Sequence, residues 1–221
     1  MERSEERAAA GGVDDRTESI FEWLHANSRL AGIAVAVVIA AALGGWLYTR
    51  AQAGKELRAE QDLQRAQASM LQGNTPLAQT DLEKLISSRS GTSGAAQGAM
   101  LLAQLHYQAG EYQKGIDALE KSGAARKEFT APAEALVGDG YSQLGKFADA
   151  AAHYRRAAES TRFKADKESY LADAARNLMA AKDTAAARQI WQDLAKDESS
   201  NLAAEARVRL GELTARPEPK S

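Results

Sequence analysis

The sequence predicts an all-α protein, in which one N-terminal transmembrane helix is followed by an α-solenoid of about four helix pairs and a capping helix. Three observations predict this architecture: the composition, one long uncharged segment and an internal repeat. The chain has 221 residues, of which 47 are alanine and 6% are aromatic. Alanine combined with abundant Leu, Glu, Lys, Gln and Arg favours helices. A β-sandwich or another sheet-rich protein is therefore disfavoured.

Charge and cysteine content narrow the classes of function. The chain has 28 Lys and Arg residues and 30 Asp and Glu residues, which gives a net charge of −2. A nucleic-acid-binding protein normally carries a basic excess that neutralises phosphates, so we expect no nucleic-acid partner. The chain has no cysteine. Disulfides, thiolate metal centres and a thiol nucleophile are therefore excluded.

Residues 1–29 form an acidic N-terminal segment, with seven acidic and four basic side chains. Near its end, Ile20, Phe21, Trp23 and Leu24 predict a short amphipathic helix lying at the membrane surface.

Residues 30–49 contain no charged side chain and read LAGIAVAVVIAAALGGWLYT. As a helix they span roughly 30 Å, the thickness of a bilayer core, which predicts a transmembrane helix. Two alternatives remain open: a buried core helix, and a signal peptide cleaved near Ala51-Gln52-Ala53. The length of the apolar run and the acidic segment before it favour a retained anchor.

Small residues recur every four positions in this span, at Gly32, Ala36, Ala40 and Gly44. Such a stripe allows a second helix to approach closely in lipid, so we take it as a candidate helix-packing face. The alternative is a chance pattern in an alanine-rich span. The flanking charges do not fix the orientation, because two basic residues lie within fifteen positions before the span and three lie after it.

An internal repeat follows the span. The clearest copy has Gly145, Phe147, Ala150, Tyr154 and Ala157. The same register recurs in three further copies, at Gly73, Thr75, Ala78, Leu82 and Leu85; at Gly110, Tyr112, Gly115, Leu119 and Ser122; and at Lys182, Thr184, Ala187, Trp191 and Leu194. The copies are 37, 35 and 37 residues apart.

Each copy predicts two antiparallel helices joined at the first residue of the pattern. Glycine leaves the helical conformation cheaply and so suits the turn. The small residue five positions later lets the second helix pack closely on the first, and the bulky residue after it fills the space below. One pair cannot bury its apolar face alone, so neighbouring pairs must stack.

This pattern resembles the tetratricopeptide repeat family, most clearly at Gly138, Tyr141, Gly145, Phe147 and Ala150. The match continues at Tyr154 and Ala157. The chain departs from the family in lacking the early tryptophan and the closing proline, and its period exceeds the usual length of about 34 residues. We expect longer loops, such as residues 87–94, to absorb the excess.

The order of the parts also resembles the ancillary-subunit family of the bacterial SecYEG translocon, through the acidic N-terminus, the span ending in Gly45, Trp46 and Tyr48, and the alanine-rich repeats. This resemblance implies a single-pass inner-membrane protein with a cytoplasmic N-terminus and a periplasmic repeat domain. It also implies translocon subunits, periplasmic chaperones and clients as partners.

No pattern predicts catalysis, a cofactor, a metal site or a small-molecule substrate. The three histidines, His25, His106 and His153, lack metal-ligand spacing. His106 occupies a position where the repeat packs a tyrosine, so we expect a core or groove residue. Gly138-Asp139-Gly140 has neither a preceding strand nor a Lys-Ser/Thr pair, so it does not predict a phosphate-binding loop.

A binding surface is the remaining candidate site, because the first helices of stacked pairs line the concave side of a solenoid. Amide, phenol and thioether side chains suit contact with polypeptide. The candidate groove residues are Gln97, Met100, Gln104, Tyr107, Gln108, Asp139, Ser142, Gln143, Arg176 and Met179. The alternative is that they form only the solvated inner face of a scaffold. The sequence has no cluster of Lys and Arg that would make a carboxylate clamp.

We therefore expect an acidic segment (1–29), a transmembrane helix (30–49), a repeat domain (50–213) closed by a capping helix over 201–213, and a disordered tail (214–221). The favoured function is a membrane-anchored interaction module at the translocon. The alternative is an envelope scaffold that self-associates and has no role in secretion.

Overall fold

The computed structural model describes residues 28–122 and 127–215 and divides the chain into two units, Met1–Gly54 and Lys55–Ser221. Every regular element in the described ranges is a helix, which confirms the predicted fold class. The helices are α2 (Ser28–Leu71), α3 (Thr75–Ser88), α4 (Ser93–Gln108), α5 (Tyr112–Lys121), α6 (Lys127–Gln143), α7 (Phe147–Ser160), α8 (Lys164–Ala180), α9 (Thr184–Lys196) and α10 (Ala203–Ala215).

Two predicted terminal features fall largely outside the described residues. They are the interfacial helix within residues 1–29 and the tail at 214–221. The capping helix expected over 201–213 is α10, which extends to Ala215 and so includes the first two residues of that tail.

The predicted span lies in α2, which is the one helix in the described part of the chain that is long and apolar enough to cross a membrane. Between Gly32 and Thr49, every side chain that the structure describes is exposed. A core helix of a soluble domain would instead be mostly buried, so the exposure argues against that alternative. The large apolar side chains Ile33, Val38 and Leu47 are each more than half exposed.

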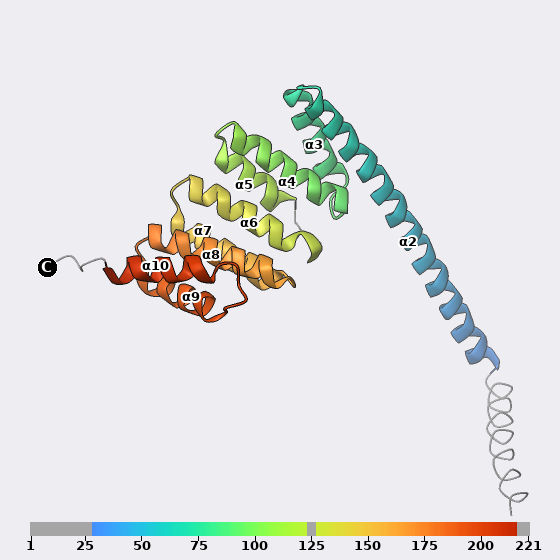
Figure 1. The fold of residues 1–221 in the computed structure, drawn as a ribbon. Coiled ribbons are helices and arrows are strands. Elements are labelled where there is room, and N and C mark those ends of the chain that lie inside the picture. The colour runs from blue at the N-terminus through green and yellow to red at the C-terminus, as the bar shows by residue number, and fades with distance from the viewer. Residues whose placement is uncertain (1–27, 123–126, 216–221) are drawn as a thin grey trace, which may run out of the picture. The chain divides into compact units, whose positions relative to one another are not determined.

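The second unit consists of stacked helix pairs. Figure 1 shows helices α3 to α10 stacked together, and each packs on the helices next to it in sequence. The second half of α2 completes the first pair, because Ala59 and Leu63 share a buried cluster with Leu82 and Leu85 of α3. Two further buried clusters continue the core. One includes Ile116, and the other includes most of the buried residues of α8 and α9.

The turns within the four pairs share one geometry. Each contains a residue of positive φ, and these residues are the four register positions of the repeat: Gly73, Gly110, Gly145 and Lys182. At each turn the residue after the positive-φ position donates its N–H to a carbonyl five residues back, as Lys146 does to Tyr141 at 2.9 Å. This bond satisfies a carbonyl at the end of the first helix, as in a Schellman motif.

Lys182 is the one described non-glycine residue with positive φ, at 65°. A left-handed conformation costs a residue with a Cβ about 1–2 kcal/mol. We therefore expect Lys182→Gly to raise the free energy of unfolding by about 1 kcal/mol, measured by urea denaturation of the full-length chain in detergent. Lys182→Ala removes the charge but keeps the Cβ, so it should bring no such gain. Equal stabilisation by both substitutions would contradict this explanation.

The small and bulky positions of the repeat form the core, as predicted. The small residues are fully buried at Ala78, Ala150 and Ala187, and Gly115 is also buried. The bulky residues that follow them are buried too: Leu82, Leu119, Tyr154 and Trp191.

The loop expected over residues 87–94 is shorter than predicted. Helix α3 continues to Ser88, and α4 begins at Ser93, capped by the Thr92 hydroxyl, which accepts the Ala95 N–H at 3.1 Å. Gly94 therefore lies inside α4, where close packing requires glycine, because a Cβ there would meet the Ala59 backbone carbonyl carbon at 2.8 Å. Longer helices therefore absorb part of the excess repeat length.

Candidate functional site

A groove of about 660 Å³ opens at the turn end of the first helices α4, α6 and α8. We call it the tyrosine groove. Six of the ten predicted groove residues line it: Tyr107, Gln108, Asp139, Ser142, Gln143 and Arg176. Repeat stacking brings them together from three helices that are separated by about 35 residues in sequence.

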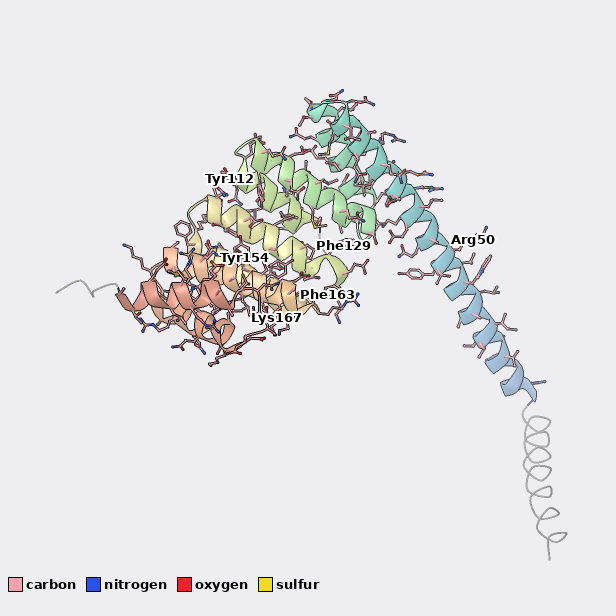
Figure 2. The ribbon with its side chains drawn as sticks, in the orientation of Figure 1. Arg50, Tyr112, Phe129, Tyr154, Phe163 and Lys167 are labelled. Carbon is pink, nitrogen blue, oxygen red and sulfur yellow. The ribbon has the colours of Figure 1, made fainter. Side chains whose placement is uncertain are left out.

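The other six lining residues were not predicted from the sequence. They are Tyr112, Phe147, Tyr154, Asp173, Asn177 and Ala180. The first three belong to the second helices α5 and α7 (Figure 2 labels Tyr112 and Tyr154). The sequence-based prediction placed the groove on first helices alone. The aromatic residues two positions after Gly110 and Gly145 were a signal that second helices would also contribute to it.

The remaining predicted groove residues lie elsewhere. Gln97, Met100 and Gln104 line a second cavity of about 330 Å³ together with Gln67 of α2. Met179 lines neither cavity. Its sulfur accepts a hydrogen bond from Trp191 Nε1 at 3.3 Å, so its side chain packs toward the core of the last pair.

Two glycines of α6 make room for the tyrosines that give the groove its shape. A Cβ on Gly138 would lie 3.1 Å from the ring of Tyr154, and a Cβ on Gly140 would meet the Tyr107 ring carbon Cζ at 2.9 Å. The Tyr107 hydroxyl donates a hydrogen bond to the Leu136 carbonyl at 2.9 Å, which fixes this side chain across α6. The Gly138-Asp139-Gly140 segment is therefore part of a helix, and its two glycines allow two tyrosines to pack closely on either side of the Asp139 carboxylate.

Asp139 lines the groove between these tyrosines, with part of its side chain open to solvent. Its Oδ1 accepts a hydrogen bond from the Tyr154 hydroxyl. Partial burial raises the pKa of Asp139 above its ordinary value, and the nearby negative charge of Asp173 raises it further. The hydrogen bond from Tyr154 acts in the opposite direction and lowers this pKa. Burial, with the carboxylate beside it, also raises the pKa of the Tyr154 hydroxyl, which therefore stays a donor.

Removal of the Tyr154 hydroxyl should raise the pKa of Asp139 further, because the hydrogen bond that stabilises the carboxylate is lost. A carboxyl-selective NMR titration of Tyr154→Phe checks this. Tyr112→Phe is the control, since no hydrogen bond joins that hydroxyl to Asp139. A raised folded-state pKa means that Asp139 lowers stability progressively as pH rises through that pKa. An unchanged or lowered Asp139 pKa in Tyr154→Phe would contradict the assignment.

Arg176 is held by two carboxylates. Its Nε and Nη2 donate to Glu205 at 3.0 and 2.7 Å, and its Nη1 donates to Asp173 Oδ1 at 2.5 Å. The guanidinium also lies 5.9 Å from the Trp191 ring centroid. These contacts join α8 to α10 and position Arg176 at the edge of the groove with all three nitrogens occupied.

The described histidines make structural contacts. His106 Nδ1 lies 2.8 Å from Glu111 Oε2, and the His153 ring stacks on Tyr141 at a centroid distance of 5.1 Å. His106 faces a third cavity of about 830 Å³, away from the tyrosine groove. Within residues 28–122 and 127–215, no group of three or more His, Asp or Glu side chains is placed to hold a metal ion.

The candidate membrane helix-packing face is a separate feature of the first unit. Its members Gly32, Ala36, Ala40 and Gly44 are all exposed on α2. A Cβ at Gly32 or Gly44 would have no neighbour within 4 Å, so neither glycine is required by packing inside this chain.

Comparison with known proteins identifies the repeats. The sequence matches a family model described as a tetratricopeptide repeat-like domain over residues 22–126 and 61–172. Two crystal structures are similar: the nearly identical TPR-like repeats of a protein described as a Podosopora anserina kinesin light chain, and a single-substitution variant of it. Each structure has a TM-score of 0.55 and is 14% identical in sequence to this chain. Each match covers 71% of this chain, and it covers 85% of the first solved chain and 84% of the second. This identity supports similarity of fold alone. No curated protein matches the chain.

Proposed function

This chain belongs to the tetratricopeptide repeat-like family, and from that premise we propose that it is a membrane-anchored protein-interaction module whose tyrosine groove holds a segment of another polypeptide. In this proposal residues 30–49 form the anchor and residues 50–213 the interaction domain. The observation that carries it is the groove itself, a cavity of about 660 Å³ lined from five helices.

The chemistry of the groove suits a polypeptide. The exposed amides of Gln108 and Gln143 offer donors and acceptors that can pair with a peptide backbone. The rings of Tyr112 and Phe147 offer flat apolar area for side chains. Tetratricopeptide repeats typically serve as interaction scaffolds and lack enzymatic activity. We therefore assign this chain to the class of interaction scaffolds and propose no reaction or cofactor for it.

The partner that we propose is the Sec translocon. The acidic N-terminus, the single span and the alanine-rich repeats resemble its ancillary-subunit family. The protein would then be an accessory subunit in the bacterial inner membrane, with a cytoplasmic N-terminus and periplasmic repeats. There it would link the translocon to periplasmic chaperones or clients.

Affinity isolation of the full-length chain from detergent-solubilised membranes tests this proposal. Translocon subunits should be recovered with it in reproducible amounts, and their consistent absence would overturn the translocon assignment. Protease added to intact spheroplasts tests the orientation. Cleavage of the repeat domain from outside is expected, whereas full protection would place the repeats in the cytoplasm.

Self-association through the span is the second candidate function. It is favoured by the exposed stripe of Gly32, Ala36, Ala40 and Gly44, since small residues permit close helix contact in lipid. Replacing all four by leucine separates the two candidates. Loss of self-association with translocon subunits still recovered supports the accessory role. Self-association of the unmodified chain without any recovery of translocon subunits supports the scaffold.

A further inference from the structure

We propose that the tyrosine groove selects polypeptide segments that carry a lysine or arginine side chain, and that Asp139 is the group that pairs with this cation. The inference rests on the proposed function and adds the chemistry of the partner. It follows from the charges of the groove, the contacts of Asp139 and the aromatic walls.

The groove has an excess of negative charge. Two carboxylates, Asp139 and Asp173, line it with a single guanidinium, that of Arg176. This guanidinium is already bound by Asp173 and by Glu205, whose Oε2 accepts from Nη2 at 2.7 Å. Arg176 is therefore not available to an anionic ligand, and the groove is complementary to a cation.

Asp139 is the carboxylate that remains open to a ligand. Among the described residues, no Lys or Arg forms an ion pair with it, and its hydrogen bond comes from the neutral Tyr154 hydroxyl. Partial burial raises its pKa, because the carboxylate loses part of its hydration in the groove. An ammonium or guanidinium group within hydrogen-bond reach would relieve this cost and gain a charge-assisted contact.

The aromatic walls suit the rest of a basic side chain. Tyr107 and Tyr112 stand with ring centroids 5.9 Å apart and planes tilted by 44°. Ring faces attract cations, and the methylene stem of lysine or arginine packs on apolar area. The amides of Gln108 and Gln143 lie in the same groove and can bind a peptide backbone, which favours a polypeptide over a free small cation.

The test uses the full-length chain in detergent and four pools of short random-sequence peptides, with lysine, arginine, glutamine or glutamate fixed at the centre. At physiological ionic strength the lysine and arginine pools should bind about tenfold more tightly than the glutamate pool. Asp139→Asn keeps the shape of the side chain and can still accept from Tyr154. It should reduce this preference to less than about twofold while leaving the glutamine pool unchanged.

Asp193→Asn is the matched control, because Asp193 lies on α9 outside the groove and pairs with Lys196. It should retain the full preference. Equal binding of all four pools by the unmodified chain would overturn this inference and leave the proposed function standing. Binding of no pool would overturn both. A basic preference that survives Asp139→Asn would overturn the role of Asp139.

Discussion

Replacing Trp191 by alanine is expected to lower the free energy of unfolding of the last repeat by about 3–5 kcal/mol. Trp191 is fully buried, and it lies in a cluster with Leu178 and Ala206 from the two helices that flank α9. Removing the indole leaves a cavity between α8 and α10 that small neighbouring residues cannot fill. It also removes the hydrogen bond that the indole donates to the Met179 sulfur.

The loss should be local, because each repeat of a solenoid contacts mainly its neighbours. Hydrogen exchange of the full-length chain in detergent measures this, and protection should fall most in α8 to α10. Trp46→Ala is the control, since that tryptophan is 54% exposed in the first unit and its loss should leave the repeats unchanged. Equal effects of the two substitutions would contradict the packing described here.

Gly140→Ala should destabilise the protein by about 1–3 kcal/mol, although alanine is the better helix former. The added methyl would lie 2.7 Å from Ile116 Cγ1 and would displace the ring of Tyr107. Tyr107 would then lose its hydrogen bond to the Leu136 carbonyl, and the tyrosine groove would change shape. Peptide binding should therefore fall together with stability.

Gly211→Ala is the matched control for Gly140. Gly211 lies in α10, and a Cβ there would meet no atom within 4 Å. Alanine should therefore stabilise α10 by up to about 1 kcal/mol. Urea denaturation followed by circular dichroism should give opposite signs for the two substitutions. Stabilisation by both substitutions would show that Gly140 is not a position of forced close approach.

The repeat fold was predictable because its determinants are local and periodic. The turn residues and buried positions occur at fixed offsets, so four copies reinforce one register. Even Lys182, which occupies a glycine position, adopts the left-handed conformation that the register requires. The long apolar helix α2 was predictable from the length of the uncharged segment.

The exact membership of the groove was less predictable, because a cavity depends on how neighbouring repeats stack. Helix position alone does not show that Gln104 opens into a separate cavity or that Met179 turns toward Trp191. The Tyr154 side chain reaches the groove from a second helix because Gly138 leaves space for its ring. The spacing of Gly138 and Gly140 around Asp139 was the available signal. The sequence pattern assigns Gly138 to a small position of the repeat but gives no role to Gly140.

The central claim, that the tyrosine groove holds a polypeptide at the translocon, is tested most directly by site-specific crosslinking. Because the chain has no cysteine, Gln143→Cys places a single thiol in the groove, and Gln192→Cys places one on exposed α9 outside it. Each thiol carries a benzophenone in membranes that contain a secreted polypeptide arrested during translocation. We predict a crosslink to that polypeptide from position 143 and none from position 192. Equal yields from both positions, or none from position 143, would contradict the claim.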